Sequence, residues 1–210
     1  GGGGDATRFD LTAGYRFLQL KEGFFAEEVL RPDTTAFPAF PAGSSYTIVD
    51  DINTKNDYHA FELGAIWQRQ SGKIIWDVAG SAAFGRLTRG YTLNGNTVFN
   101  EPSGATNSDV PGGFLVRPED IGSHENTEFS VMPQARIGMA YCLQRNLRLH
   151  VDYSFLYLDD VFRPGSLMAT EFNGQELLAP PANGVGTAAA MTSQDDVYFH
   201  ALSLGISCNY

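Results

Sequence analysis

The chain has 210 residues, of which 24 are acidic and 14 basic, so its net charge is −10. This length suits one domain, and the acidic balance argues against nucleic acid, which needs a basic surface. No apolar run approaches the ~20 residues of a membrane-spanning helix. A membrane β-barrel is not excluded, because only alternate residues of its strands need be apolar.

The sequence opens on Gly1 to Gly4, which has no structural interpretation. There is no initiator Met and no signal peptide, so we expect a processed or incomplete product. The two cysteines, Cys142 and Cys208, fall on separate predicted strands and on opposite faces by phase. We therefore expect both to be unpaired.

Six segments alternate apolar and polar residues with the period of two that a β-strand requires. The clearest contains Leu149, Val151 and Tyr153 on one face and His150 and Asp152 on the other. The predicted strands cover residues 8–20, 58–70, 73–85 with a continuation toward 93, 128–143, 147–158 and 195–210.

Pro133 falls inside the fourth of these strands. Because proline supplies no N–H to a strand ladder, we expect either a β-bulge at this position or an error in the strand assignment there.

The connections between these strands alternate in length. Three long loops are predicted at residues 22–57, 94–125 and 159–194, separated by short turns at Ser71-Gly72 and Gln144–Asn146. Strict alternation puts all three long loops at one end of an up-and-down antiparallel sheet. Outer-membrane barrels are built this way, with short periplasmic turns and longer extracellular loops.

The last strand, DDVYFHALSLGISCNY, carries Leu202, Leu204 and Ile206 on one face and small polar residues on the other. A soluble sheet would turn the apolar face to a core, whereas a membrane barrel turns it to lipid. The chain stops on an aromatic residue within the alternation, and this ending resembles the terminal strand of bacterial outer-membrane barrels.

Four stretches are similar, in order, to one known family: RFDLTAGYRFLQLKEG, GGFLVRPEDIGSHENTEFSVMPQARIGMAY, LRLHVDYSFLYLDDVFRPG and DDVYFHALSLGISCNY. They resemble the putative beta-barrel porin-seven family, and AGYRF and YSFLYLDDVFRPG are the most specific parts. The resemblance covers nearly the whole chain. It implies a bacterial outer-membrane β-barrel and supplies no catalytic or binding residues. The chain departs from the family pattern in lacking strand-forming sequence before residue 8.

Barrel closure requires more than six strands, because single-chain membrane barrels begin at 8. Strands could lie within the long loops, such as Tyr46 to Val49 with Arg86 to Leu93, or in a segment upstream, or the barrel could be shared between copies of the chain. We expect missing or overlooked strands that give about 8–12 in total.

Charged residues collect on the face that a membrane barrel turns inward. They could form a constriction that selects solutes, or a paired network that fills a narrow interior. The candidate lumen-lining residues are Asp10, Arg16, Glu62, Asp77, Arg136, Arg148, His150 and Asp152.

Aromatic residues of the other face lie near the predicted strand ends. In a membrane barrel such residues form interfacial girdles, whereas in a soluble protein they would be ordinary core residues. The candidate membrane-interface aromatics are Tyr15, Trp67, Trp76, Tyr141, Tyr157 and Tyr210.

No motif indicates catalysis, a cofactor or a metal. The four histidines show no metal-ligand spacing, and no Ser/His/Asp order or phosphate-binding loop is present. The acidic pairs Asp50-Asp51, Asp159-Asp160 and Asp195-Asp196 flank the long loops, where they could bind cations or simply be solvated.

The sequence therefore predicts a single-domain (1–210), non-catalytic, all-β protein: an antiparallel up-and-down transmembrane β-barrel of the bacterial outer membrane. Its function is predicted to be porin-like or structural, in contact with the bilayer and lipopolysaccharide. Two alternatives remain: a surface-array or assembly component that contacts other copies or envelope proteins through its loops, and a soluble ligand-binding barrel.

Overall fold

A computed structural model describes residues 5–31, 42–102, 107–144, 146–168 and 195–208. Most of them lie in strands of one antiparallel sheet. Among these residues no helix has the length and apolarity that crossing a membrane requires. The elements are β1 (Ala6–Leu30), β2 (Ser45–Ser71), β3 (Ile74–Asn100), β4 (Asn107–Pro111), the 3₁₀ turn η1 (Pro118–Asp120), β5 (Gly122–Gln144), β6 (Leu147–Val161), α1 (Pro164–Leu167) and β7 (Asp195–Cys208).

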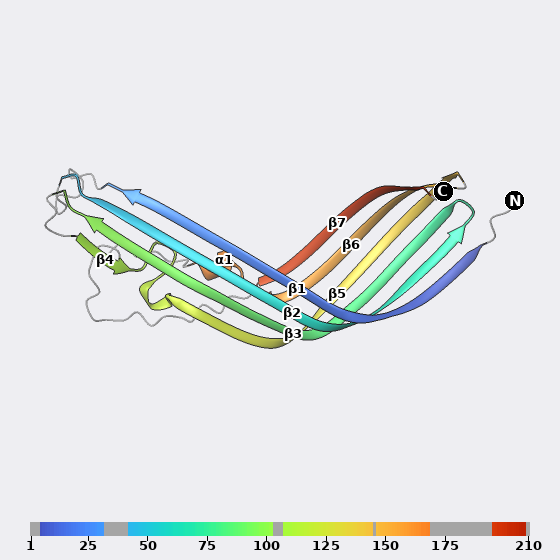
Figure 1. Ribbon diagram of the computed structural model, residues 1–210, viewed down its shortest axis with the longest axis horizontal. Coiled ribbons are helices and arrows are strands. Elements are labelled where there is room, and N and C mark those ends of the chain that lie inside the picture. Colours follow the sequence, from blue (N-terminus) through green and yellow to red (C-terminus); the bar gives the residue numbers. More distant parts are fainter. Residues whose placement is uncertain (1–4, 32–41, 103–106, 145, 169–194, 209–210) are drawn as a thin grey trace.

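The strands pair in the order β1-β2-β3-β5-β6-β7, with the short β4 added beside β3. Every pairing is antiparallel, as predicted for an up-and-down sheet. The sheet curls strongly into a half-barrel, and its two ends, β1 and β7, are not paired with each other (Figure 1). The start of β1 and the end of β7 lie at the same end as the short turns, while β4 lies at the opposite end.

The prediction of long loops was wrong for most of the residues that the structure describes there. Residues 22–30 continue β1, residues 45–57 belong to β2 and residues 94–100 belong to β3. The segments Tyr46 to Val49 and Arg86 to Leu93 thus lengthen predicted strands instead of adding new ones. Residues 32–41, 103–106 and 169–194 of the predicted loops lie outside the described residues.

The turn predicted near Ser71-Gly72 is confirmed, because β2 ends at Ser71 and β3 begins at Ile74. At the second predicted turn β5 ends at Gln144 and β6 begins at Leu147, and residue 145 lies outside the described residues. Gly72 has a φ of 59°, a left-handed conformation that glycine adopts without steric cost. The bulge predicted at Pro133 is absent, because β3 and β5 stay in continuous register with Pro133 opposite Ala82. The pairing of β5 with β6 begins only at Gln134, so Pro133 lies where one side of β5 has no strand partner and a missing N–H is tolerated.

The convex face of the sheet carries the odd-numbered residues of β1, β2, β5 and β6 and the even-numbered residues of β3 and β7. In the half of the sheet nearest the short turns this face is apolar and uncovered: Leu11 is 79%, Leu204 76% and Phe129 73% exposed. The cross-strand register joins these residues into a continuous surface, for example Trp67–Val78–Ile137–Tyr153–Leu202. Monomeric soluble proteins rarely expose so large an apolar patch.

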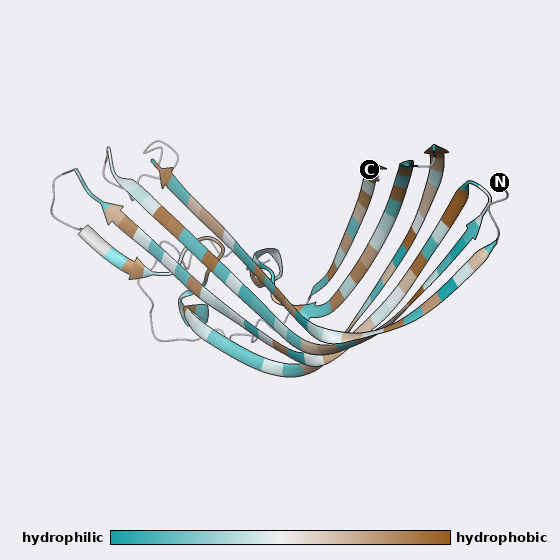
Figure 2. Cartoon of the chain, turned by 45° about the vertical axis from the view of Figure 1, so that its right-hand side comes forward, coloured by the Kyte–Doolittle hydropathy of each residue, from teal (hydrophilic) through white to brown (hydrophobic). Residues whose placement is uncertain are grey.

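The polarity of the two faces reverses halfway along the strands, without any slip in register. In β2, the apolar residues Phe61 and Trp67 lie on the convex face, whereas Tyr58 and Ile52 lie buried on the concave face. Residues between Thr47 and Asp57 that share the convex face are polar except for Val49. The alternation is visible as brown and teal bands along each strand (Figure 2).

The half of the concave face away from the short turns, where the connections from β1 to β2, from β3 to β5 and from β6 to β7 lie, is covered by the protein's own chain. We call these the long connections. One buried cluster joins Tyr58, Leu87, Met132 and Leu158, and a second joins Ile52, Leu93 and Val116 to Phe162 and Leu167. The second cluster therefore packs the segment after β6, including α1, against β2 and β3.

Gly85 of β3 lies in close contact with the backbone of β2. A Cβ at this residue would stand 2.1 Å from the carbonyl oxygen of His59 and 2.5 Å from Cα of Ala60. Only glycine allows the backbones of β2 and β3 to approach this closely.

Candidate functional site: the concave face

All eight charged residues predicted to share one face do so. They lie on the concave face in the half nearest the short turns, with Arg16 and Glu62 on β1 and β2. The Arg16 guanidinium donates two hydrogen bonds to the Glu62 carboxylate, each of 2.6 Å. Both side chains are about three-quarters or more buried, at 25% and 19% exposure. A forked pair of this kind is geometrically specific and fixes both side chains.

A second network crosses β2, β3 and β5. Asp77 accepts hydrogen bonds from Arg136 at 2.5 Å and from Gln68 at 2.7 Å. His150 and Asp152 of β6 lie 3.4 Å apart, and Gly138 leaves room for the Asp152 carboxylate beside it.

The remaining two predicted residues lie near the rim of this face. Asp10 pairs with Arg8 at 2.7 Å, close to the start of β1. Arg148 stands opposite Ser207 of β7 and makes no ion pair within the described residues. The geometry thus joins six of the eight residues to one another in pairs and leaves Asp10 and Arg148 outside them.

The predicted interfacial aromatics that the structure describes lie on the convex face. Tyr15, Trp67, Trp76 and Tyr141 are at least 36% exposed there. Tyr157 stacks beside Tyr198 with ring centroids 5.0 Å apart, while Tyr210 lies outside the described residues. Two histidines join these aromatics: Tyr15 hydrogen-bonds His59, and Tyr153 hydrogen-bonds His200 at 2.6 Å.

In the other half of the concave face, Asp50 holds the segment after β4 against the sheet. Its carboxylate is only 2% exposed and accepts hydrogen bonds from the backbone N–H groups of Phe114, Leu115 and Val116 at 3.0, 3.1 and 2.9 Å. Several N–H donors converging on one carboxylate offset the cost of its burial.

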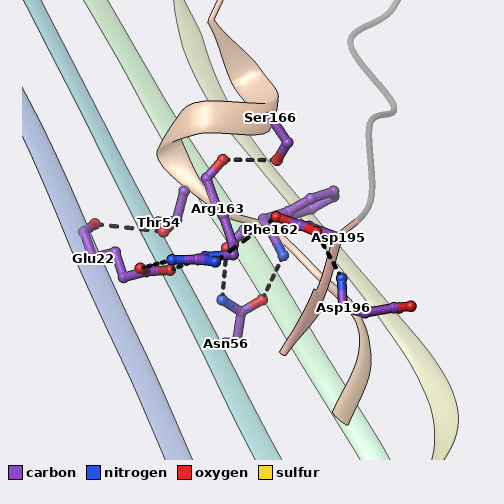
Figure 3. Close-up of polar contacts among 8 residues, drawn as sticks. All are labelled: Glu22, Thr54, Asn56, Phe162, Arg163, Ser166, Asp195 and Asp196. Carbon is purple, nitrogen blue, oxygen red and sulfur yellow. Dashed lines mark hydrogen bonds and ion pairs between the residues drawn. The ribbon is translucent and has the colours of Figure 1, made fainter. Parts of the chain in front are cut away.

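The segment after β6 is held in the same way by Asn56 (Figure 3). The buried Asn56 amide donates to the carbonyl of Phe162 at 2.8 Å and accepts from the N–H of Phe162 at 2.9 Å. Both polar groups of one backbone residue are thereby satisfied by one side chain. Asp160, with a left-handed φ of 56°, marks the bulge at which the chain leaves β6 and turns inward.

Arg163 connects this segment to β1 and β7. Its guanidinium donates to the Glu22 carboxylate at 3.1 and 2.9 Å, and lies 3.9 Å from Asp195 (Figure 3). These hydrogen bonds to Glu22, and its negative charge, raise the pKa of Arg163 above its ordinary value. The Ser166 hydroxyl donates to the Arg163 carbonyl at 2.8 Å and closes the first turn of α1.

Arg89 is the largest fully buried side chain in the described structure. It donates to the carbonyl of Asp160, pairs with Glu128 at 2.7 Å and stands 5.1 Å from the ring centroid of Phe162. A buried guanidinium is tolerated only with such partners. Arg89 and Asn56 thus anchor the inward segment from adjacent strands.

The sequence prediction missed Glu22, Asp50, Asn56, Arg89 and Arg163 as members of a site. Most of them fell in stretches interpreted as surface loops. A usable signal was present, since Tyr46, Ile48, Ile52 and Tyr58 repeat with a period of two on the phase opposite to that of Phe61 and Leu63.

No group of three or more His, Cys, Asp or Glu side chains within the described ranges could hold a metal ion. Of the acidic pairs considered for cations, Asp50 binds backbone amides instead, and Asp195 lies beside Arg163. Cys142 and Cys208 are free and occupy opposite faces.

The fold and this site define an all-β protein in the form of a half-barrel, with an apolar convex face and an ion-paired, partly covered concave face. A comparison with protein-family models matches residues 3–210 to the family described as Putative beta barrel porin-7. The chain belongs to this family. No curated protein and no solved structure matches it.

Proposed function

We propose that the protein is a bacterial outer-membrane β-barrel whose concave face lines a narrow, water-filled lumen, and that it acts as a porin-like channel without catalytic activity. One observation carries this proposal. The half of the sheet nearest the short turns is apolar and exposed on its convex face, and charged and ion-paired on its concave face. A membrane barrel requires this distribution, which is the reverse of a soluble sheet.

The height of the apolar surface supports a membrane location. It extends from Phe9 to Phe17 on β1 and from Trp76 to Phe84 on β3, about nine residues in each strand. Roughly 9–11 tilted residues suffice to cross a bilayer. Tyr15 and His59 lie at the end of this band toward the long connections, His59 in register with Phe17, where amphipathic rings favour the headgroup region.

Closure of the barrel is part of the proposal. Unpaired backbone groups in hydrocarbon cost several kcal/mol each, so the free sides of β1 and β7 must meet further strands. The expected total stays at about 8–12 strands. With the long connections facing outward, the short turns face the periplasm.

The lumen is proposed to be narrow at its outer half. The segments held by Asp50 and Asn56 occupy the concave face there, next to the Glu22–Arg163 pair. We infer that only small solutes pass. In the half nearest the short turns, the ion-paired residues of the concave face then set the charge along the lumen. They include Arg16, Glu62, Asp77 and Arg136.

The test is single-channel recording of the full chain after insertion into planar bilayers. Discrete conductance steps are expected, small in comparison with those of wide porins. A flat trace from protein that has inserted, shown by a folded band that shifts on heating in gel electrophoresis, would exclude the channel and leave a structural barrel acting through its loops. Recovery of the protein in the soluble fraction without detergent would exclude the membrane location itself.

A further inference from the structure

The convex face carries two lysines directly opposite each other, outside the apolar band. Lys21 of β1 is in register with Lys55 of β2, and both side chains are exposed. Like charges in direct cross-strand opposition destabilise a sheet. The Lys55 ammonium pairs with Asp57, whereas Lys21 makes no ion pair in the part of the chain that the structure describes. This surface therefore favours an anion between the two strands.

The position of the lysines matches the depth of lipid phosphates. Lys21 lies four residues beyond Phe17, which ends the apolar band on β1. That separation is about 13 Å along a strand and roughly 9–10 Å along the membrane normal at a tilt of about 45°. The headgroup layer begins at the edge of the ~30 Å hydrocarbon core and is about 5–8 Å deep. A flexible lysine side chain reaches back over the remaining distance.

A groove beside the lysines offers hydrogen-bond partners for a headgroup. Gly23 and Gly90 leave space in it, and Thr92 and Ser123 contribute hydroxyl groups. Asn53 also lines the groove, but its amide donates to Asp51 at 2.7 Å. The hydroxyls of Thr92 and Ser123 lie 2.9 Å apart. Glu125 stands at the β5 end of the same groove, and Asp57 accompanies Lys55 at the β1–β2 end. The phosphate therefore belongs next to Lys21, whose charge no carboxylate neutralises among the described residues.

A third cation and an apolar groove lie on the membrane side of the lysines. Arg86 is exposed, stands in register between His59 and Phe129, and has no ion pair among the described residues. It borders a groove whose other walls include Phe61 and Phe84. This groove has the chemistry to hold an acyl chain below a phosphate.

We propose that Lys21, Lys55 and Arg86 bind the phosphate of an anionic lipid in the leaflet at the long-connection end of the barrel. The polar groove takes headgroup hydroxyls and the aromatic groove takes an acyl chain. In the outer membrane this lipid is the lipid A part of lipopolysaccharide. The site rests on the proposed membrane insertion, but not on conductance.

The test uses the full chain, refolded in detergent micelles, and native mass spectrometry with diphosphoryl lipid A. Each basic residue near an anionic lipid surface contributes about 1 kcal/mol, so the double variant Lys21→Gln/Lys55→Gln is expected to weaken lipid A binding at least about tenfold. The matched control Arg69→Gln/Lys73→Gln removes two positive charges at the other end of β2 and the turn after it. It is expected to bind as the unaltered protein does.

Equal binding by both double variants would overturn the proposal. Binding of dephosphorylated lipid A as tight as that of the diphosphoryl form would also overturn it, as would inorganic phosphate binding with the affinity of lipid A. A folded band that shifts on heating is checked for every variant. If the unaltered chain does not insert into vesicles, the proposed membrane function and the lipid site are both excluded. If it inserts but Lys21→Gln/Lys55→Gln binds lipid A as tightly as the unaltered chain, only the lipid site is excluded.

Discussion

At the scale of single residues, Asn56 and Gly85 are expected to be the positions where a substitution by alanine destabilises the fold. Asn56 satisfies both the N–H and the carbonyl of Phe162 in a buried environment. Removing the amide leaves two buried backbone groups without this partner, at about 1–3 kcal/mol each. We expect Asn56→Ala to raise hydrogen exchange in residues 162–168. The exposed Asn94→Ala is the control, and equal exchange in both variants would contradict this role.

Gly85 is expected to tolerate no side chain. A Cβ there meets the backbone of His59 and Ala60, which cannot move aside as a flexible side chain could. Overpacking of this kind costs about 1–3 kcal/mol, so Gly85→Ala should lower the urea midpoint of unfolding. In the matched control Gly80→Ala, on the same strand, the added Cβ meets nothing within 4 Å. If Gly85→Ala and Gly80→Ala unfold at the same urea midpoint, β2 and β3 can move apart at Gly85 without loss of stability, which would contradict this role.

At the scale of the strand, the surroundings of each face change halfway along. In the half nearest the short turns, the convex face is proposed to meet lipid and the concave face water. Leu204 on the convex face of β7 is 76% exposed, and lipid is its proposed surrounding. An arginine at mid-membrane on the lipid face costs roughly 2–4 kcal/mol, so Leu204→Arg should reduce the inserted fraction in vesicles. Ser203→Arg, on the concave face beside Asp152, should insert normally. Equal insertion of both variants would argue against lipid on the convex face.

At the scale of the whole molecule, the inward segment and the charged face determine what passes through the barrel. Arg163 ties that segment to Glu22 on β1 and approaches Asp195 on β7. We expect Arg163→Gln to raise single-channel conductance or open probability severalfold, because the segment then leaves the concave face more often. Arg69→Gln, on the convex face, is the control. Unchanged conductance in Arg163→Gln would mean that the segment does not limit the channel.

Sequence periodicity predicted the up-and-down order of the strands and which of the described candidate residues share a face. These features are local, because a period of two assigns side chains to faces without knowledge of the partner strand. For example, the alternation around Arg148 and Asp152 placed both residues on the concave face. The family resemblance rested on the same segments.

The sequence by itself therefore determined which residues share a face and how the strands follow one another. Only the tertiary structure decided how far the strands extend and what covers their concave face. The reason is physical. Beyond Asp57 and Arg89, toward the long connections, the apolar residues move from the convex to the concave face. That face is known to be buried only because Phe162, Val116 and Leu167 pack on it. Those contacts join residues far apart in the chain, and Asn56 and Phe162 are 106 positions apart, so no local pattern encodes them.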